Sequence, residues 1–364
     1  MLPARNKHIT IASLSKNFLL LKSLLLWLAP LILAGCGTSD SSSKSMFTIP
    51  AKDHAVYEQL LAEPETKIRY IKSFDLTTLA CREVWPENPD DVRSILVFIH
   101  GTATQSRLYL PLADTLKKNN IATVLLDLRG HGLSGGERGD VPSIDALVRD
   151  VRITLDSIRN AYPGKKIILG GHSLGAGLCL KFVEFFSSRK KLYTPPDAMI
   201  LMSGGFLMSK DCDSSEASRL RDYQNGRSFA KIDAMDIALY FPAGYFGIHP
   251  KSIEVLLPTE DSAVARAVKQ GLFTTKYSVQ FFLASFPFEP RLTYRKLKFP
   301  VLLVAGKQDE LMRTCDAIYS YEKLHEPNKE LFLVSEANHT NIIWLSAGAI
   351  AEWINGLETE MDSN

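Results

Sequence analysis

Residues 167–177 read IILGGHSLGAG, an apolar run that ends at Ser173 between glycines. A continuous run of this kind predicts a strand that is covered on both faces. The Ala/Leu/Cys-rich residues that follow predict a helix over about 173–188. Gly171 and Gly175 then indicate a sharp strand-to-helix turn, where larger side chains would collide with the strand and the helix. We expect this turn to raise the Ser173 hydroxyl above the edge of a sheet.

Similar apolar runs recur along the chain and alternate with helical patterns. This alternation predicts an α/β protein with a mostly parallel central sheet and helices on both faces. An antiparallel hairpin is expected at the sheet edge, over about 68–85. The other strands are predicted at 94–99, 123–126, 166–169, 198–202 and 301–304, and the helices at about 106–118, 143–161, 173–188, 314–324 and 343–357.

The alternation breaks between about residues 206 and 298. An insertion of this length is either a lid over a site or disordered, and its aromatic content opposes disorder. We therefore predict a mostly helical cap, inserted before the strand at 301–304. Phe281 and Phe282 are adjacent and cannot both face a groove from one side of a helix, so one of them is expected in the core. The aromatic residues are Tyr240, Phe241, Tyr245, Phe246, Phe273, Tyr277, Phe281, Phe282, Phe286 and Phe288.

The N-terminal residues differ from the rest of the chain. Basic residues precede a short apolar run that Pro30 interrupts, which predicts an export signal over 1–35 rather than a spanning helix. Leu33-Ala34-Gly35-Cys36 resembles the lipobox of bacterial lipoproteins, which implies a lipid anchor on Cys36. An ordinary cleaved signal with a chance cysteine is the alternative. A Gly/Ser-rich flexible tether is predicted over 36–50 and the folded domain over 51–364.

The lipobox resemblance also predicts a location. It places the protein in the bacterial cell envelope, held at a membrane by its anchor. Gly37 is not an acidic retention residue, which favours the outer membrane.

Charge and cysteine spacing exclude several classes of protein. A net charge of +2 with 23% charged residues argues against a disordered chain and against a nucleic-acid partner. Cys81, Cys179, Cys212 and Cys315 form no close CxxC pair, so zinc and thioredoxin-like chemistry are not expected. We predict no metal and no cofactor. Disulfides fit an oxidising compartment, but the sequence leaves their pairing open.

A serine nucleophile needs a base, and the base needs an orienting acid. Elimination among the histidines leaves His339, which follows the last predicted strand. Asp309 follows the strand that ends at Gly306 and completes the chain order nucleophile, acid, histidine, with Glu310 as the nearby alternative. The backbone N–H groups of Leu174 and Thr102 are the expected donors to an oxyanion.

Four stretches resemble the α/β-hydrolase superfamily, within it the monoacylglycerol lipase and lysophospholipase group that is also classed with serine aminopeptidases. They read FIHGTATQS, LLDLRGHGLSGGERG, GGHSLGAG and VAGKQDELM…ANHT, and they span about 95–340 without the cap. The resemblance implies the α/β-hydrolase fold, nucleophile Ser173, acid Asp309, base His339 and oxyanion donors Thr102 and Leu174. The loop 102–105 departs from the acidic or histidine residue common in monoacylglycerol lipases, which leaves headgroup recognition open.

The leading hypothesis is a serine hydrolase of carboxylic esters, acting on monoacylglycerol-like or lysophospholipid-like lipids, or on other small esters. An aminopeptidase or amidase with the same triad is the alternative, because Glu216, Asp222, Asp233 and Asp236 in the cap offer carboxylates for a substrate amine. A third hypothesis is a non-catalytic surface lipoprotein that uses the fold for binding. The sequence leaves the oligomeric state open.

Overall fold

The computed structural model describes residues 44–47, 49–62, 66–189, 194–233 and 247–362. The predicted signal and residues 36–43 of the predicted tether lie outside these residues, as do four aromatic residues of the cap, Tyr240, Phe241, Tyr245 and Phe246. Within the described part of the chain, no helix is both long and apolar enough to cross a membrane.

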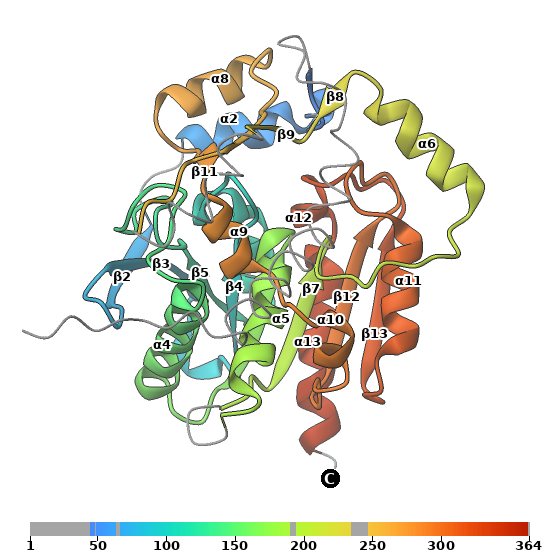
Figure 1. Ribbon diagram of the computed structural model, residues 1–364. Coiled ribbons are helices and arrows are strands. Elements are labelled where there is room, and N and C mark those ends of the chain that lie inside the picture. The colour runs from blue at the N-terminus through green and yellow to red at the C-terminus, as the bar shows by residue number, and fades with distance from the viewer. Residues whose placement is uncertain (1–43, 48, 63–65, 190–193, 234–246, 363–364) are drawn as a thin grey trace, which may run out of the picture.

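An eight-stranded sheet forms the centre of the molecule (Figure 1). Its strand order is β13-β12-β7-β6-β4-β5-β3-β2. The six strands from β13 to β5 are parallel to one another. At the other edge, β3 pairs antiparallel with β5 and forms an antiparallel hairpin with β2. The strands are β2 (Lys67–Lys72), β3 (Thr78–Val84), β4 (Ser94–Ile99), β5 (Ala122–Leu126), β6 (Lys166–His172), β7 (Ala198–Met202), β12 (Val301–Gly306) and β13 (Lys329–Val334).

Helices cover both faces of this sheet. Because side chains alternate along a strand, Ile95 and Val97 of β4 join the core beneath α4, α5 and α11, whereas Leu96 and Phe98 join the core beneath α3, α12 and α13. This arrangement is the mostly parallel α/β sheet that the sequence predicts. The helices are α2 (His54–Ala62), α3 (Leu110–Lys117), α4 (Ala146–Ala161), α5 (Leu174–Phe186), α11 (Thr314–Lys323), α12 (Ile342–Leu345) and α13 (Ala347–Asp362), with short 3-10 helices at Ala51–Asp53, Pro89–Asp91 and Ser106–Tyr109.

The cap lies between β7 and β12 and contains both helices and strands. Beyond the helices that the sequence predicts, it carries a three-stranded antiparallel sheet of order β11-β10-β9. Together with α2 and α8, this small sheet stands above the central sheet (Figure 1). The cap elements are α6 (Ser214–Gln224), β8 (Arg227–Ser228), β9 (Ala230–Ile232), β10 (Ile253–Val255), α8 (Ser262–Lys269), β11 (Lys276–Tyr277), α9 (Val279–Ser285) and α10 (Pro290–Tyr294).

The packed part of the chain begins before residue 50, where the sequence predicts the tether to end. Lys44–Ser45 (β1) pairs in parallel with β8 of the cap, and the Met46 side chain is fully buried. The physical reason lies in the composition, because the Gly/Ser-rich stretch gives way to Met46 and Phe47. Their apolar side chains lose contact with water when they pack against the cap.

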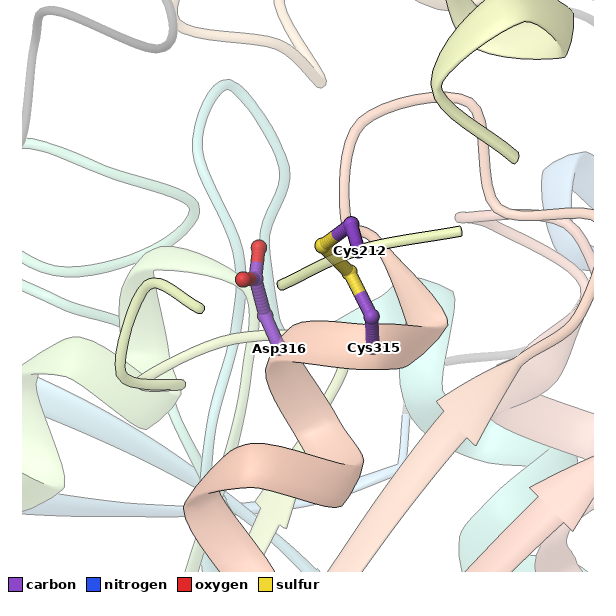
Figure 2. A group of neighbouring side chains, drawn as sticks. All are labelled: Cys212, Cys315 and Asp316. Carbon is purple, nitrogen blue, oxygen red and sulfur yellow. A yellow bond between two sulfur atoms is a disulfide. The ribbon is translucent and has the colours of Figure 1, made fainter. Parts of the chain in front are cut away.

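A disulfide joins Cys212, near the start of the cap, to Cys315 in the first turn of α11 (Figure 2). Their Cα atoms lie 5.5 Å apart. The Glu216 carboxylate of α6 reinforces this junction by accepting hydrogen bonds from the N–H groups of Thr314 (2.6 Å) and Cys315 (3.3 Å). A cap helix is therefore attached to the segment that directly follows Asp309.

Candidate active site

Ser173 occupies the turn between β6 and α5. Its backbone has φ 56° and ψ −117°, a conformation that residues other than glycine rarely adopt. The flanking glycines permit this turn. A Cβ on Gly171 would lie 2.3 Å from the carbonyl carbon of Gly175, and a Cβ on Gly175 would lie 2.2 Å from the carbonyl oxygen of Ile99. Both approaches are shorter than any van der Waals contact, so the turn requires glycine at both positions.

The structure brings His339 and Asp309 to Ser173. His339 follows β13 and Asp309 follows β12, so all three side chains lie at the carboxyl edge of the parallel sheet. His339 Nε2 lies 2.9 Å from Ser173 Oγ, and His339 Nδ1 lies 3.0 Å from Asp309 Oδ2. This spacing suits proton transfer from the serine hydroxyl to a neutral imidazole whose other nitrogen donates to the carboxylate.

The surroundings of Asp309 and His339 stabilise their charged forms. Burial alone raises the pKa of Asp309, but the His339 charge and the hydrogen bonds from His339 and from the N–H groups of Met312 and Leu311 outweigh burial and hold this pKa below its ordinary value. Burial alone lowers the pKa of His339, but the Asp309 charge and hydrogen bond outweigh it and raise this pKa above its ordinary value. An imidazolium formed during reaction is thereby stabilised.

Glu310, the alternative acid, contacts the backbone of His339 and not its ring. Glu310 Oε2 accepts a hydrogen bond of 2.9 Å from the His339 N–H, and Oε1 is buried without a hydrogen-bond partner. Burial and the neighbouring Asp309 charge raise the pKa of Glu310 to about 7. The geometry therefore favours Asp309 over Glu310 as the group that orients the imidazole.

Thr102 and Leu174 flank Ser173 and line the same cavity. Leu174 is the first residue of α5, where backbone N–H groups point out of the helix and the helix dipole is positive. Thr102 lies in the loop after β4, and two tyrosines hold the amides on either side of it. Tyr109 Oη accepts from the Gly101 N–H, and Tyr277 Oη accepts from the Ala103 N–H, each at 2.8 Å.

Each of these tyrosines is in turn paired with a buried histidine. Tyr109 Oη lies 2.8 Å from His172 Nδ1, and His172 Nε2 lies 2.8 Å from the carbonyl oxygen of His339. A carbonyl only accepts, so Nε2 carries the proton and Nδ1 accepts from the tyrosine hydroxyl. Burial and the His339 charge lower the pKa of His172 to about 3, which keeps this ring neutral.

The second pair has the same arrangement. Tyr277 Oη lies 2.8 Å from His131 Nε2, and His131 Nδ1 lies 3.0 Å from the Arg129 carbonyl oxygen. Burial holds the pKa of His131 well below its ordinary value. The roles of Tyr109 and Tyr277 could not be identified from sequence, because no local pattern connects a tyrosine in a 3-10 helix or in the cap with the loop after β4.

Ser173 opens onto two cavities. The larger, about 360 Å³, is mainly apolar and is lined by residues that include Leu220 of α6, Phe282 of α9 and Met312 of the loop after β12. The smaller, about 50 Å³, is also lined by His339 and by apolar side chains that include Leu257 and Phe273. Phe282 faces the larger cavity, while the ring of Phe281 packs against Tyr277 and His131, so these neighbours divide between cavity and core as expected.

Among the described residues, one group of side chains is spaced closely enough to hold a metal ion: Cys212, Cys315 and Asp316 (Figure 2). The two sulfur atoms are bonded to each other and offer no thiolate. Asp316 accepts hydrogen bonds from Arg313 and from the Ser209 N–H. This donor set does not fit a metal, since its charge is already neutralised.

The family profile described as serine aminopeptidase S33 (Hydrolase_4) matches residues 90–343. The chain belongs to this family. Mouse monoglyceride lipase is 28% identical over 284 residues, which cover 76% of this chain and 84% of the mouse protein. Human monoglyceride lipase is 33% identical over 32% of this chain and 38% of its own length. The monoacylglycerol lipase of Mycolicibacterium smegmatis is also 33% identical, over 28% of this chain and 35% of its own length.

Solved structures agree on the fold. The monoacylglycerol lipase of Paleococcus ferrophilus superimposes with a TM-score of 0.54 at 21% identity, over 76% of this chain and 98% of that one. A soluble variant of monoglyceride lipase from Saccharomyces cerevisiae gives 0.58 at 16% identity, over 81% and 96%. These matches confirm the predicted α/β-hydrolase fold, and the family members and relatives place the chain among the carboxylic ester hydrolases.

Proposed function

We propose that this chain is a serine hydrolase that cleaves monoacyl lipid esters, such as monoacylglycerols or lysophospholipids, with Ser173 as nucleophile, His339 as base and Asp309 as orienting acid. The observation that carries the proposal is the hydrogen-bonded series from Ser173 Oγ through His339 to Asp309, at the wall of a mainly apolar cavity. Monoglyceride lipases among its relatives support the same substrate class.

In the proposed reaction, His339 Nε2 takes the proton of Ser173 as Oγ attacks the ester carbonyl carbon. The carbonyl oxygen becomes an oxyanion, which the N–H groups of Leu174 and Thr102 bind. The intermediate collapses, the carbon–oxygen bond to the alcohol breaks, and the alcohol leaves with the proton from His339. Water then gives a proton to His339 as its oxygen attacks the carbonyl carbon of the acyl-serine. The bond between that carbon and Ser173 Oγ breaks, His339 returns the proton to Oγ, and the fatty acid leaves.

The larger cavity suits an acyl chain better than a charged amine. Each methylene that enters an apolar cavity gains up to about 0.8 kcal/mol. The aminopeptidase alternative needs a carboxylate to hold a substrate amine, but Asp316, which lines this cavity, is paired with Arg313. Glu216, one of the cap carboxylates considered for that role, binds the N–H groups at the start of α11. These contacts favour the ester substrate.

We also propose that Cys36 carries a lipid anchor and that the protein resides in the bacterial cell envelope, with the outer membrane preferred because Gly37 is not acidic. An anchor would hold the site beside amphiphilic substrates. The disulfide between Cys212 and Cys315 agrees with this location, because disulfides persist in oxidising compartments.

A fluorophosphonate label and a substrate panel test this proposal. The panel contains monoacylglycerols, lysophospholipids, short-chain esters and aminoacyl amides, and we expect the long-chain monoacyl esters to give the highest kcat/KM. Ser173→Ala should abolish labelling and lower kcat by about 10⁴ or more. The matched control is Ser187→Ala, at the opposite end of α5, which should label and turn over normally.

Two results would overturn parts of the proposal separately. If aminoacyl amides were the best substrates, the ester assignment would fall and the serine mechanism would stand. If the folded protein took up no label at Ser173, the mechanism itself would fall and the binding-protein hypothesis would gain.

A further inference from the structure

Residues 44–47, which lie near the end of the predicted tether, run along the active site. In β1, Lys44 and Ser45 pair in parallel with Arg227 and Ser228 of the cap strand β8. The pairing continues one residue further, because the Met46 N–H donates to the Ser228 carbonyl oxygen at 3.2 Å. This backbone ladder sets the direction in which Met46 and the following residue project.

Side chains on both sides of the ladder hold the segment. The Ser45 hydroxyl donates to the Leu256 carbonyl oxygen at 2.7 Å, and the Tyr223 hydroxyl donates to the Met46 carbonyl oxygen at 2.7 Å. Ser45 Oγ also accepts from the Phe47 N–H at 3.0 Å. The segment is therefore fixed to two separate parts of the cap.

Met46 and Phe47 border different cavities beside Ser173. Met46 lines the larger cavity and Phe47 lines the smaller one, and Ser173 lines both. The ring of Phe47 lies 6.1 Å from that of His339 and 5.6 Å from that of Phe229, measured between centroids. One short segment thus supplies an apolar side chain to each of the two spaces that meet at the nucleophile.

We propose that Met46 and Phe47 form a partition that sets the substrate specificity of this enzyme, with Met46 limiting the space for the acyl chain and Phe47 limiting the space for the leaving alcohol. The proposal deepens the proposed function and rests on it, because an ester presents an acyl group and an alcohol to opposite sides of the serine. The larger cavity takes the acyl group, and the smaller one takes the alcohol.

The partition lies outside the residues that the family profile matches. That match begins at residue 90, well after Met46 and Phe47. If Cys36 carries the lipid, ten residue steps separate the anchor from Met46, a reach of at most about 36 Å in a fully extended chain. The same segment would then set the specificity and hold the active site close to the membrane surface.

Two ester series distinguish the two halves of the partition. One series varies the acyl chain from four to sixteen carbons on a constant alcohol, and the other varies the alcohol on a constant acyl group. Met46→Trp should lower the kcat/KM ratio of long to short acyl chains at least tenfold and leave the alcohol series unchanged. Phe47→Ala should raise kcat/KM for bulky alcohols relative to small ones several-fold and leave the acyl series unchanged.

The controls separate this proposal from a folding defect and from the proposed function. Lys52→Ala changes an exposed residue of the same N-terminal region and should leave both series unchanged. Fluorophosphonate labelling of each variant reports an intact nucleophile. Wild-type protein that hydrolysed no ester would refute the proposed function. Normal wild-type hydrolysis, with labelled variants that altered neither series or altered both equally, would refute the partition alone.

A pair of truncations gives a second test that needs no substitution. Removal of residues 1–43 should preserve both specificity profiles, because Met46 and Phe47 remain. Removal of residues 1–49 should broaden both profiles. Equal profiles for the two labelled truncations would also overturn the proposal.

Discussion

Removal of the Cys212–Cys315 disulfide should destabilise the protein by several kcal/mol. The bond joins residues 103 positions apart, so it closes a loop that contains nearly the whole cap and β12. In the chain-entropy treatment, closing a loop of this length lowers the entropy of the unfolded chain and raises its free energy by about 4.7 kcal/mol at 25 °C. We expect the double variant Cys212→Ser/Cys315→Ser to lose between about 2 and 5 kcal/mol of unfolding free energy.

Urea denaturation, followed by tryptophan fluorescence with and without a dithiol reductant, measures this effect. The reductant should shift the wild-type curve onto that of the double variant and leave the variant unchanged, because Cys81 and Cys179 are buried free thiols. In the absence of urea, both proteins should still take up the fluorophosphonate label, since Glu216 continues to hold α6 on α11. A loss below about 1 kcal/mol, or a reductant effect on the double variant, would refute the reasoning.

Three further predictions concern the site. Asp309→Asn should lower kcat by about 10⁴, because it leaves the imidazole in the wrong tautomer, whereas Glu310→Gln should cost less than tenfold, because its amide oxygen still accepts from the backbone. The raised pKa of His339 should place the acid limb of the kcat/KM profile above pH 6.5, with activity rising as the ring deprotonates. Because the Glu310 charge helps to raise the pKa of His339, Glu310→Gln should move this limb to lower pH. A move to higher pH would contradict that role of the Glu310 charge. Tyr277→Phe should lower kcat about tenfold with little change in KM, because the Ala103 N–H loses its acceptor, and an unchanged kcat would show that the loop holds without it.

Much of the sheet, and the placement of three candidate residues at one edge of it, could be predicted from sequence because the signals are local. The continuous apolar run at β4 starts and ends where the sequence predicts, as does β7. Ser173 directly follows β6, Asp309 and His339 lie in the loops after β12 and β13, and the carboxyl ends of parallel strands share one edge of the sheet. Their proximity therefore follows once the strands are identified.

The remaining features depend on residues far apart in the chain. The disulfide joins residues 103 positions apart, and the hydrogen bond from Ala103 to Tyr277 joins residues 174 positions apart. The backbone hydrogen bond from Met46 to Ser228 of β8 spans about 180 positions. No spacing rule or propensity encodes such contacts. The small sheet of the cap was missed for a related reason, because strands of two or three residues leave too short a pattern to detect.

The hydrogen bonds between the cap and the loop after β4 limit how the cap of this enzyme could be exchanged. Replacing the cap of a hydrolase with that of a relative assumes that the cap determines selectivity independently of the catalytic residues. Three hydrogen bonds join this cap to the loop. The Ala103 N–H donates to the Tyr277 hydroxyl, and the Thr274 N–H donates to the Ala103 carbonyl oxygen. The side-chain amide of Gln105 donates to the Leu272 carbonyl oxygen. A chimaera that imported a foreign cap without these three anchor points would lose rate along with selectivity, so residues 272–277 should be inherited with the catalytic domain.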